Sequence, residues 1–207
     1  DVRHLVTVSC TGFFAPGVDR ALIQGLGLSP TVERTQIGFM GCHAAINALR
    51  AARGLAAGEP GAHVLACSVE LCSIHYHYRW APLQVVGNAL FADGAAAFVG
   101  RLAEGDAPWR VTACGSMRIP DSQGAMRWEI GDHGFEMHLG RKVPTLIRTH
   151  VAEWLGPWLA TRGMTLADVA SRGQLLPHRQ APESLSESWR SFRKRWTFRM
   201  FHPVRSE

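Results

Sequence analysis

The 207-residue sequence lacks any long hydrophobic run, since no stretch of about 18 apolar residues occurs in it, and this argues against a transmembrane helix. It also lacks the features of a secretory signal peptide, because residues 1–6 carry no Met and no basic segment followed by an apolar run. We expect this N-terminus to lead into a strand, as in a chain taken from a longer protein. Internal repeats and low-complexity segments are absent too. With 46% hydrophobic residues, the chain is expected to be globular with a sizeable core.

The cysteines do not form an obvious disulfide framework or zinc motif. Their number is odd, and they stand among apolar or small residues, as is typical of proteins from a reducing cytoplasm. Cys67 and Cys72 lie five residues apart and are followed by His75 and His77, so a metal site there is conceivable. However, the zinc spacings C-x2-C and H-x3-H are missing. We therefore expect buried structural thiols and no bound metal.

The net charge of +5 is concentrated at one end of the chain. Residues 172–207 hold eight of the Lys and Arg residues and three of the acidic ones, whereas residues 1–171 are balanced. The basic pI therefore does not indicate a nucleic-acid surface on the whole protein. Cations and aromatics mix at residues 189–196, which leaves binding of nucleic acid or of an anionic surface open. We favour a non-native or disordered extension instead.

The hydrophobic pattern predicts strands that alternate with helices, and hence an α/β fold with a layered sheet. We predict strands at residues 5–9, 35–40, 64–69, 95–99 and 110–116. The apolar runs 64–69 and 95–99 are typical of strands covered on both faces. Helices are predicted at residues 17–26, 42–55 and 144–154, and Pro157 should end or kink the last of these.

Cys42 is the candidate nucleophile of the sequence, because Gly41 and Cys42 join a predicted strand to a long Ala-rich helix. A cysteine at a helix N-terminus feels the positive end of the helix dipole, which favours the thiolate. Such a thiolate could carry an acyl group as a thioester. The alternative is a buried cysteine at the end of a core helix.

Five segments, taken together, resemble type III polyketide synthases of the chalcone and stilbene synthase family, in their bacterial form. Residues 38–45 (GFMGCHAA) are similar to the family's nucleophile segment, and residues 64–70 (VLACSVE) to the strand that follows it. Residues 86–97 (VGNALFADGAAA) are close to the most recognisable run of the family. Residues 11–17 (TGFFAPG) resemble the loop that reaches across the homodimer interface. Residues 131–137 (GDHGFEM), followed by Val143 and Pro144, also look bacterial.

The resemblance implies a thiolase-like, layered αβαβα fold, of which this chain holds the end of the N-terminal half and the start of the C-terminal half. It implies that Cys42 accepts an acyl group from an acyl-CoA starter. Decarboxylation of malonyl-CoA and condensation would follow, with no cofactor besides the coenzyme A thioesters. The implied partners are these thioesters and a second copy of the chain in a homodimer. The implied location is the cytoplasm, with no nucleic acid bound.

The resemblance also implies which side chains line the substrate cavity. Phe91 matches the aromatic gatekeeper between the CoA tunnel and the cavity, and Met137 falls where plant members carry a second Phe. His75 and Trp128 match positions that set the cavity volume, and Cys10 aligns with a further pocket position. Ordinary core packing is the alternative for each residue, above all for Met137 and Cys10.

The resemblance stops near Ser171, where the composition also changes. The family carries a catalytic His and Asn in its second half, and the His would fall near Leu175, but His178 and Arg179 do not restore the motif. The first hundred or so residues of the family, with its basic CoA-binding region, are missing as well. We interpret residues 1–171 as a partial condensing-enzyme domain. Residues 172–207 are interpreted as a basic tail outside the family, produced by a frame change or an artificial terminus, so that the chain is expected to be inactive as it stands.

Two alternatives stay open at the level of the sequence. A ketoacyl-ACP synthase III-like enzyme shares the fold and a cysteine nucleophile. A catalytically dead module could instead keep only the dimer-forming loop around Ala15.

Overall fold

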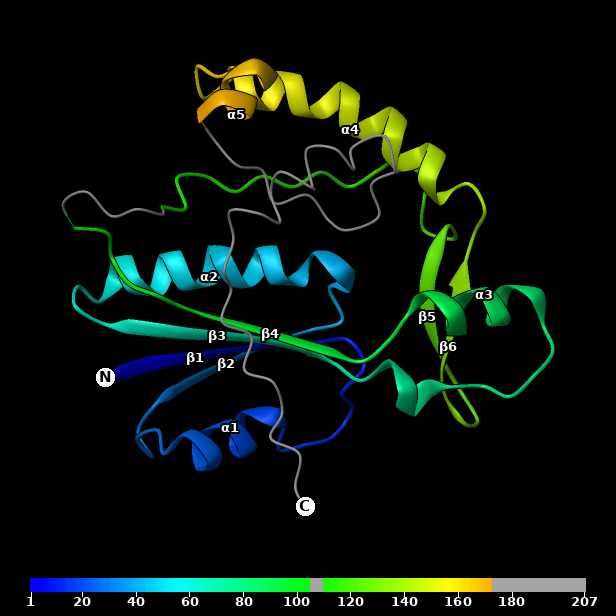
Figure 1. The fold of residues 1–207 in the computed structure, drawn as a ribbon, viewed down its shortest axis with the longest axis horizontal. Coiled ribbons are helices and arrows are strands. Elements are labelled where there is room, and N and C mark those ends of the chain that lie inside the picture. Colours follow the sequence, from blue (N-terminus) through cyan, green and yellow to red (C-terminus); the bar gives the residue numbers. More distant parts are fainter. Residues whose placement is uncertain (105–109, 173–207) are drawn as a thin grey trace. The chain divides into compact units, whose positions relative to one another are not determined.

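The computed structural model of the chain describes residues 1–104 and 110–172 (Figure 1). Its contacts divide into one unit that comprises Asp1–Val143 and another that begins at Pro144. Within the described residues, no helix is long and apolar enough to cross a membrane. The predicted tail from residue 173 onward, with Leu175 and His178, lies outside the described residues.

The first unit is built on a four-stranded sheet in the order β2-β1-β3-β4. Its strands are β1 (Val2–Ser9), β2 (Glu33–Gly38), β3 (His63–Glu70) and β4 (Gly94–Gly100). The central strand β1 pairs in parallel with both β2 and β3, whereas β4 runs antiparallel to β3. Consequently β1, β2 and β3 all end at the same edge of the sheet.

Two helices cover opposite faces of this sheet, which confirms the layered α/β arrangement (Figure 1). Helix α1 (Val18–Leu26) lies on one face and ends at Gly27, whose φ of 62° is the left-handed conformation that a glycine cap provides. Helix α2 (Ala44–Gly58) lies on the other face and buries a stripe of alanines spaced four residues apart. The stripe packs on alternate residues of β1 and β3: Ala44, Ala48, Ala52 and Ala56 against Val6, Val8, Val64 and Ala66.

A hairpin and two short helical segments complete the described part of the first unit. Strands β5 (Met126–Gly131) and β6 (Gly134–Leu139) pair across a two-residue turn, Asp132 and His133. The 3-10 turn η2 (Cys72–His75) follows β3 and leads toward α3 (Pro82–Leu90). The hydrophobic pattern predicted neither the hairpin nor α3, although Pro82 at the first helical turn is a start signal.

The second unit contains most of α4 (Val143–Ala160) and all of α5 (Leu166–Arg172). The helix predicted at residues 144–154 is confirmed, but it continues past Pro157 to Ala160, because the carbonyl of Pro157 still accepts the N–H of Thr161 at 3.1 Å. Thr165 caps α5, since it exchanges hydrogen bonds with Asp168 in a capping box.

Two strand predictions need correction. Residues 110–116 form no strand, although the apolar content of the segment predicted one. Residues 95–99 do form a strand, but Ala95, Ala96, Ala97 and Val99 are exposed, because β4 is the outer strand of the sheet. By contrast, β3 lies between two neighbours and is buried from Val64 to Cys67, as its apolar run predicted.

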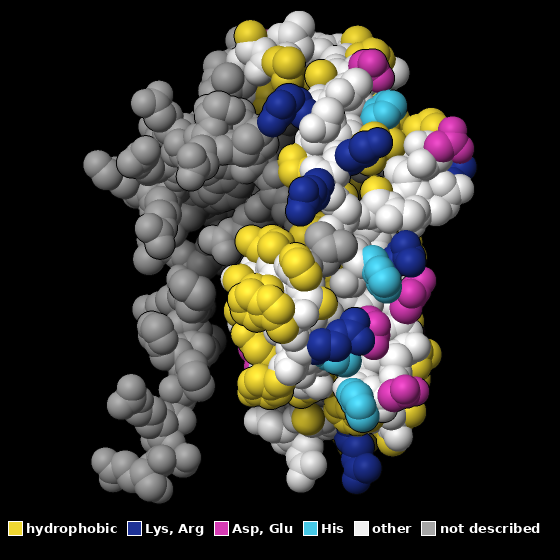
Figure 2. Space-filling model, turned by 90° about the vertical axis from the view of Figure 1, so that its right-hand side faces the viewer, with side chains coloured by type: hydrophobic (Ala, Val, Ile, Leu, Met, Phe, Trp, Pro, Cys, Tyr) yellow, Lys and Arg dark blue, Asp and Glu magenta, His cyan; other side chains and the backbone are white. Residues whose placement is uncertain are grey.

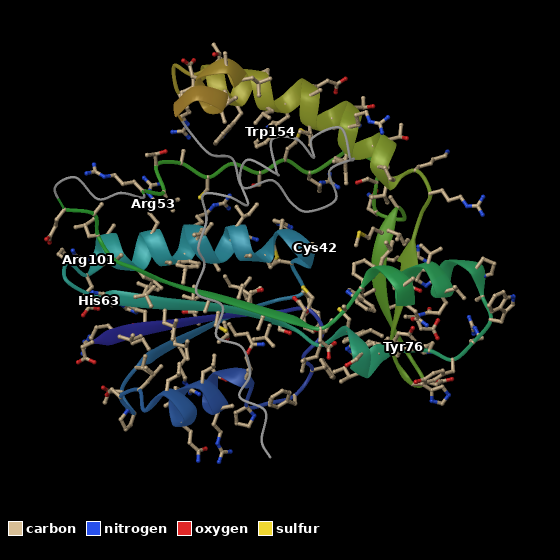
Figure 3. The ribbon with its side chains drawn as sticks, viewed as in Figure 1. Cys42, Arg53, His63, Tyr76, Arg101 and Trp154 are labelled. Carbon is tan, nitrogen blue, oxygen red and sulfur yellow. The ribbon has the colours of Figure 1, made fainter. Side chains whose placement is uncertain are left out.

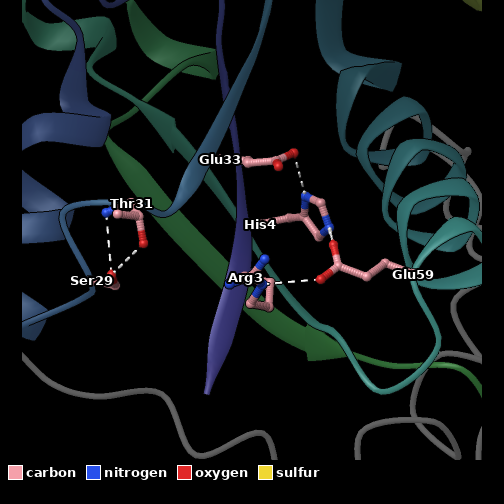
Figure 4. Close-up of polar contacts among 6 residues, drawn as sticks. All are labelled: Arg3, His4, Ser29, Thr31, Glu33 and Glu59. Atoms are coloured by element: carbon pink, nitrogen blue, oxygen red, sulfur yellow. Dashed lines mark hydrogen bonds and ion pairs between the residues drawn. The ribbon is translucent and has the colours of Figure 1, made fainter.

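The far end of the sheet is tied together by a buried histidine (Figure 4). His4 is only 5% exposed, and its Nε2 lies 3.0 Å from a carboxylate oxygen of Glu59 in the turn that leads into β3. Its Nδ1 lies 3.4 Å from Glu33 of β2. Arg3 donates to the second oxygen of Glu59 at 3.0 Å. One carboxylate thus joins two neighbouring side chains of β1 to the α2–β3 connection.

We expect Glu59→Gln to lower the free energy of unfolding by about 1–2 kcal/mol, because the carboxylate that bonds Arg3 and the buried ring of His4 loses its charge. Glu104→Gln is the matched control, since Glu104 is exposed and its oxygen lies 4.0 Å from Arg101. Urea unfolding followed by circular dichroism measures both. Equal midpoints for the two variants would contradict this role of Glu59.

Candidate active site

Two thiols and one carboxylate lie close together at the edge where the parallel strands end. Cys10 directly follows β1, Cys42 follows β2 after a short loop, and Glu70 is the last residue of β3. The carboxyl ends of parallel strands are the usual place for binding and catalysis in α/β sheets. Arg53, His63 and Arg101 lie toward the opposite end of the sheet and α2, away from Cys42 (Figure 3). The strand-end cluster is therefore the candidate site.

Cys42, the candidate nucleophile, stands on a sharp turn between β2 and α2. Phe39 (φ 55°) and Gly41 (φ 71°) both adopt the left-handed conformation, and Gly41–His43 form a 3-10 turn before α2 begins at Ala44. Only glycine reaches such a φ without strain, so Gly41 suits its place, whereas Phe39 is held there by its surroundings. Cys42 is exposed and lies directly before the helix, at the strand-to-helix junction where the sequence predicted it.

Cys10 and Glu70 support this turn from beneath. The Gly41 N–H donates to the Cys10 sulfur at 3.2 Å. Both carboxylate oxygens of Glu70 lie 3.1 Å from the Cys10 nitrogen, and one of them also accepts from Thr11, at 3.1 Å from its N–H and at 2.6 Å from its hydroxyl. The Thr11 hydroxyl accepts the N–H of Leu71 at 2.7 Å. The ends of β1 and β3 are thereby locked to each other.

The electrostatics of Cys42 differ from the expectation of a helix-stabilised thiolate. Although Cys42 as a residue is exposed, surrounding protein atoms partly bury its sulfur, and this burial raises the pKa of the Cys42 thiol. The neighbouring Cys10 thiol and Glu70 carboxylate raise it further. The sulfur precedes α2 in a 3-10 turn, and the negative charge of Glu70 lies on the same side. The surroundings therefore favour the thiol, which corrects the prediction made from the helix dipole.

The raised pKa predicts the pH dependence of alkylation. Because only the thiolate reacts, iodoacetamide should modify Cys42 more slowly near pH 7 than it modifies the same cysteine in the urea-unfolded chain. The rate should still be rising with pH above the ordinary pKa of a cysteine, since the folded state holds the proton more tightly. Peptide mapping by mass spectrometry assigns the modified residue. A rate that levels off below pH 8 would contradict the raised pKa.

The predicted cavity residues His75 and Trp128 are brought together by the hairpin. His75 is buried, with its ring 5.6 Å from Trp128 and 5.0 Å from Phe135. Its Nε2–H donates to the Thr11 carbonyl at 2.7 Å, and its Nδ1 accepts the Phe135 N–H at 3.2 Å. Both ring nitrogens are thus used to fasten β6 to the loop after β1.

Met137 packs against the middle of α3, and Phe91 directly follows the end of this helix. Met137 is buried on β6, and its side chain approaches Gly87 in the middle of the helix. Phe91 is half-buried directly after the helix, and its N–H donates to the Gly87 carbonyl at 3.1 Å. Asp93 then accepts two hydrogen bonds from Ser73, which lower the pKa of its carboxyl and tie η2 to the start of β4. Whether any of these residues contacts a substrate stays a prediction.

Hydrophobic side chains gather on the face that carries α3 and the segment leading into it (Figure 2). Tyr78 is 98% exposed and Trp80 is 91% exposed, and Leu90 at the end of α3 is 63% exposed. Closer to the turn of Cys42, the rings of Phe13, Phe39 and Phe135 contact one another edge to face, with centroids 5.6–6.2 Å apart. Phe13 and Phe39 remain largely exposed, so this aromatic cluster borders the nucleophile turn with an apolar surface.

The sequence pattern did not single out Glu70 and Thr11 as important to the site. A signal was present, because Glu70 is an acidic residue at the end of an otherwise apolar buried strand. Among the described residues, no group of three or more His, Cys, Asp or Glu could hold a metal ion. All five cysteines are free.

Comparison with known proteins bears directly on this arrangement. Residues 1–101 match the family of chalcone and stilbene synthases, N-terminal domain. The type III polyketide synthase C of Arabidopsis thaliana is 33% identical over 168 residues, which are 79% of this chain and 44% of the relative. The 3,5-dihydroxyphenylacetyl-CoA synthase of Amycolatopsis balhimycina is 35% identical over 173 residues, 82% of this chain and 46% of the relative. The chain thus spans a little under half the length of these two relatives.

Solved structures agree with the sequence comparison. The 1,3,6,8-tetrahydroxynaphthalene synthase of Streptomyces coelicolor superimposes with a TM-score of 0.73 at 28% identity, covering 81% of this chain and 48% of that one. A polyketide synthase from the brown alga Ectocarpus siliculosus gives 0.75 at 29% identity, covering 92% and 54%. The predicted thiolase-like fold, present in part, is confirmed. The chain belongs to the chalcone and stilbene synthase family of type III polyketide synthases, to whose N-terminal domain residues 1–101 correspond.

Proposed function

We propose that Cys42 is the acyl-carrying nucleophile of a type III polyketide synthase reaction. The observation that carries the proposal is the exposed Cys42 on a left-handed turn, at the edge where three parallel strands end. Its thiolate would attack the carbonyl carbon of an acyl-CoA thioester. The tetrahedral intermediate would collapse with loss of the CoA thiolate, leaving the acyl group on the Cys42 sulfur.

Condensation would follow by decarboxylation of malonyl-CoA. Loss of CO₂ leaves the enolate of acetyl-CoA, which attacks the Cys42 thioester carbonyl and releases the Cys42 thiolate. The enolate and the oxyanion need hydrogen-bond donors, the task that the family resemblance gives to a His and an Asn. The sequence near residue 175, where the resemblance places the His, does not carry the family's motif. We therefore propose that acyl loading is the step within reach of this chain and that it does not complete a polyketide as it stands.

Incubation of the chain with acyl-CoA at pH 9, where more of Cys42 is thiolate, tests the loading step. Intact mass spectrometry should show one added acyl group, and peptide mapping should place it on Cys42. A complete synthase that carries these residues can then be given malonyl-CoA and malonyl-ACP in separate reactions. Condensation with malonyl-CoA would indicate a polyketide synthase, and condensation with malonyl-ACP a ketoacyl-ACP synthase III-like enzyme. The family match and the relatives favour malonyl-CoA. No acyl adduct on any cysteine would contradict the proposal and favour a catalytically dead module.

We further propose a homodimer, formed with a second copy of the chain through the loop at residues 11–17. Phe13 and Phe14 of this loop are 67% and 62% exposed, an arrangement that favours burial against another surface. The adjoining strand β2 is an outer strand of the sheet, and residues 33–36 on it are exposed. Sedimentation of the chain, compared with a variant in which Phe13 and Phe14 are changed to Ser, tests this assembly. A monomer in both samples would contradict it.

A further inference from the structure

Cys10, which the resemblance suggested as a residue of the cavity wall, also contacts the turn that carries Cys42. It is only 5% exposed, and its sulfur lies under the nucleophile turn, where it accepts the Gly41 N–H at 3.2 Å. Burial raises the pKa of the Cys10 thiol, and the backbone N–H groups of Gly41, Met40 and Phe39 act against that rise. A row of backbone N–H groups around one acceptor is a nest, which forms where left-handed residues alternate with right-handed ones.

The turn needs such an acceptor because of its backbone conformation. Phe39 and Gly41 are both left-handed, at φ 55° and 71°, with Met40 between them at φ −91°. Among the N–H groups of this turn, that of Gly41 donates to the Cys10 sulfur, whereas the turn residues themselves are exposed. Cys10 supplies a large, polarisable sulfur at the end of β1, directly beneath them.

Glu70 holds Cys10 in place through the backbone. Its two oxygens accept from the Cys10 N–H and from the N–H and hydroxyl of Thr11, all at 2.6–3.1 Å. These bonds carry a full negative charge on the acceptor, which makes them shorter and stronger than neutral ones. Thr11 is itself held by Leu71 and His75, at 2.7 Å each. The support therefore extends from β3 through β1 to the turn of Cys42.

We propose that Cys10, fixed by Glu70, is a positioning residue that sets the nucleophile turn and thereby aims the Cys42 sulfur at the acyl carbonyl. This inference rests on the proposed function, in which Cys42 carries the acyl group. Cys10 contributes as a hydrogen-bond acceptor and does not react. A small displacement of a nucleophile lowers its rate strongly, because the attacking atom must lie within van der Waals reach of the carbonyl.

Three variants and two measurements test the proposal. Cys10→Ala removes the acceptor, Cys10→Ser keeps one, and Cys67→Ala is the matched control, because Cys67 is a buried thiol one strand away on β3. The measurements are the rate of acyl loading from acyl-CoA and the rate of iodoacetamide alkylation at Cys42, both assigned by peptide mapping. In the wild type and in the Cys10 variants, the buried Cys67 reports whether the fold stays intact.

We expect Cys10→Ala to slow loading about tenfold or more, as misplacement of a reacting group does. The same variant should speed alkylation of Cys42 several-fold, because a loosened turn exposes the sulfur and removes the neighbouring thiol that raises its pKa. Cys10→Ser should load within about threefold of the wild type, since a hydroxyl also accepts a hydrogen bond. Cys67→Ala should change neither rate, and Cys67 itself should stay protected in both Cys10 variants.

The outcomes separate this inference from the proposed function. Rates for Cys10→Ala that match those of Cys67→Ala would overturn the positioning role, and so would a Cys10→Ser variant as slow as Cys10→Ala. If the wild type loads no acyl group, the proposed function fails, and the alkylation rates still decide whether Cys10 sets the turn. If Cys10→Ala does not fold, Glu70→Gln takes its place. Glu70→Gln keeps only one of the two side-chain oxygens that accept from Cys10 and Thr11, so it should loosen Cys10 and slow acyl loading. An unchanged loading rate would overturn the inference.

Discussion

Cys42→Ala should abolish formation of the acyl-enzyme when the chain is incubated with acyl-CoA. Cys42 is the thiol that stands exposed on a strand-to-helix turn, whereas Cys10 and Cys67 are buried. Because Cys10 and Cys67 are only 5% and 7% exposed, an acyl-CoA carbonyl cannot reach their sulfurs in the folded chain. Loss of a nucleophile lowers an acyl-transfer rate by several orders of magnitude, about 10⁶-fold in well-studied hydrolases.

Intact mass spectrometry before and after mild hydroxylamine treatment measures the thioester directly. Cys72→Ala is the matched control, because Cys72 is half-buried nearby and should be dispensable. An acyl group that remains on the Cys42→Ala variant at the wild-type rate would rule out the assignment. An acyl group lost in the Cys72→Ala variant would move the nucleophile to the 3-10 turn η2.

Ala48→Leu should destabilise the first unit by about 2–3 kcal/mol, because the extra methylenes have no room between α2 and the sheet. Ala48 is 2% exposed and belongs to the alanine stripe that packs on β1 and β3. The small side chains let the helix approach the strands closely, and a larger one must force the two apart. Since α2 begins two residues after Cys42, the same change should also disturb the nucleophile turn.

Ala57→Leu on the exposed side of the same helix is the matched control. It adds the same methylenes without burying them, so its effect should stay within about 0.5 kcal/mol. Urea midpoints from circular dichroism give both values, and mass-mapped alkylation of Cys42 gives the effect on the turn. Equal destabilisation by the two substitutions would show that the stripe does not limit the helix–sheet distance.

The sequence by itself determined the alternation of elements and the position of Cys42 between a strand and a helix. Apolar runs predicted β1, β3 and β4, and the Ala-rich periodicity predicted α2, because short-range pattern and burial coincide there. The step from strand to Gly41 and Cys42 is likewise local, so the sequence placed Cys42, the candidate nucleophile, at a strand-to-helix junction that the structure also has. The hairpin and α3 were not predicted, because these elements are too short to show a clear helix or strand periodicity of hydrophobic residues. Their stability depends on their packing against each other.

Only the tertiary structure decided what surrounds Cys42. Cys10 and Glu70 are 60 residues apart in the chain, and parallel pairing of β1 with β3 brings them together at one sheet edge. The pKa of the Cys42 thiol is raised first by burial of its sulfur and then by the neighbouring Cys10 and Glu70. The helix dipole is a local property that predicts a lowered pKa, whereas burial and the charge of Glu70 arise from strands distant in sequence and raise it. A chain pattern encodes which residues are apolar or charged, but the distance between charges is set by how the sheet is ordered.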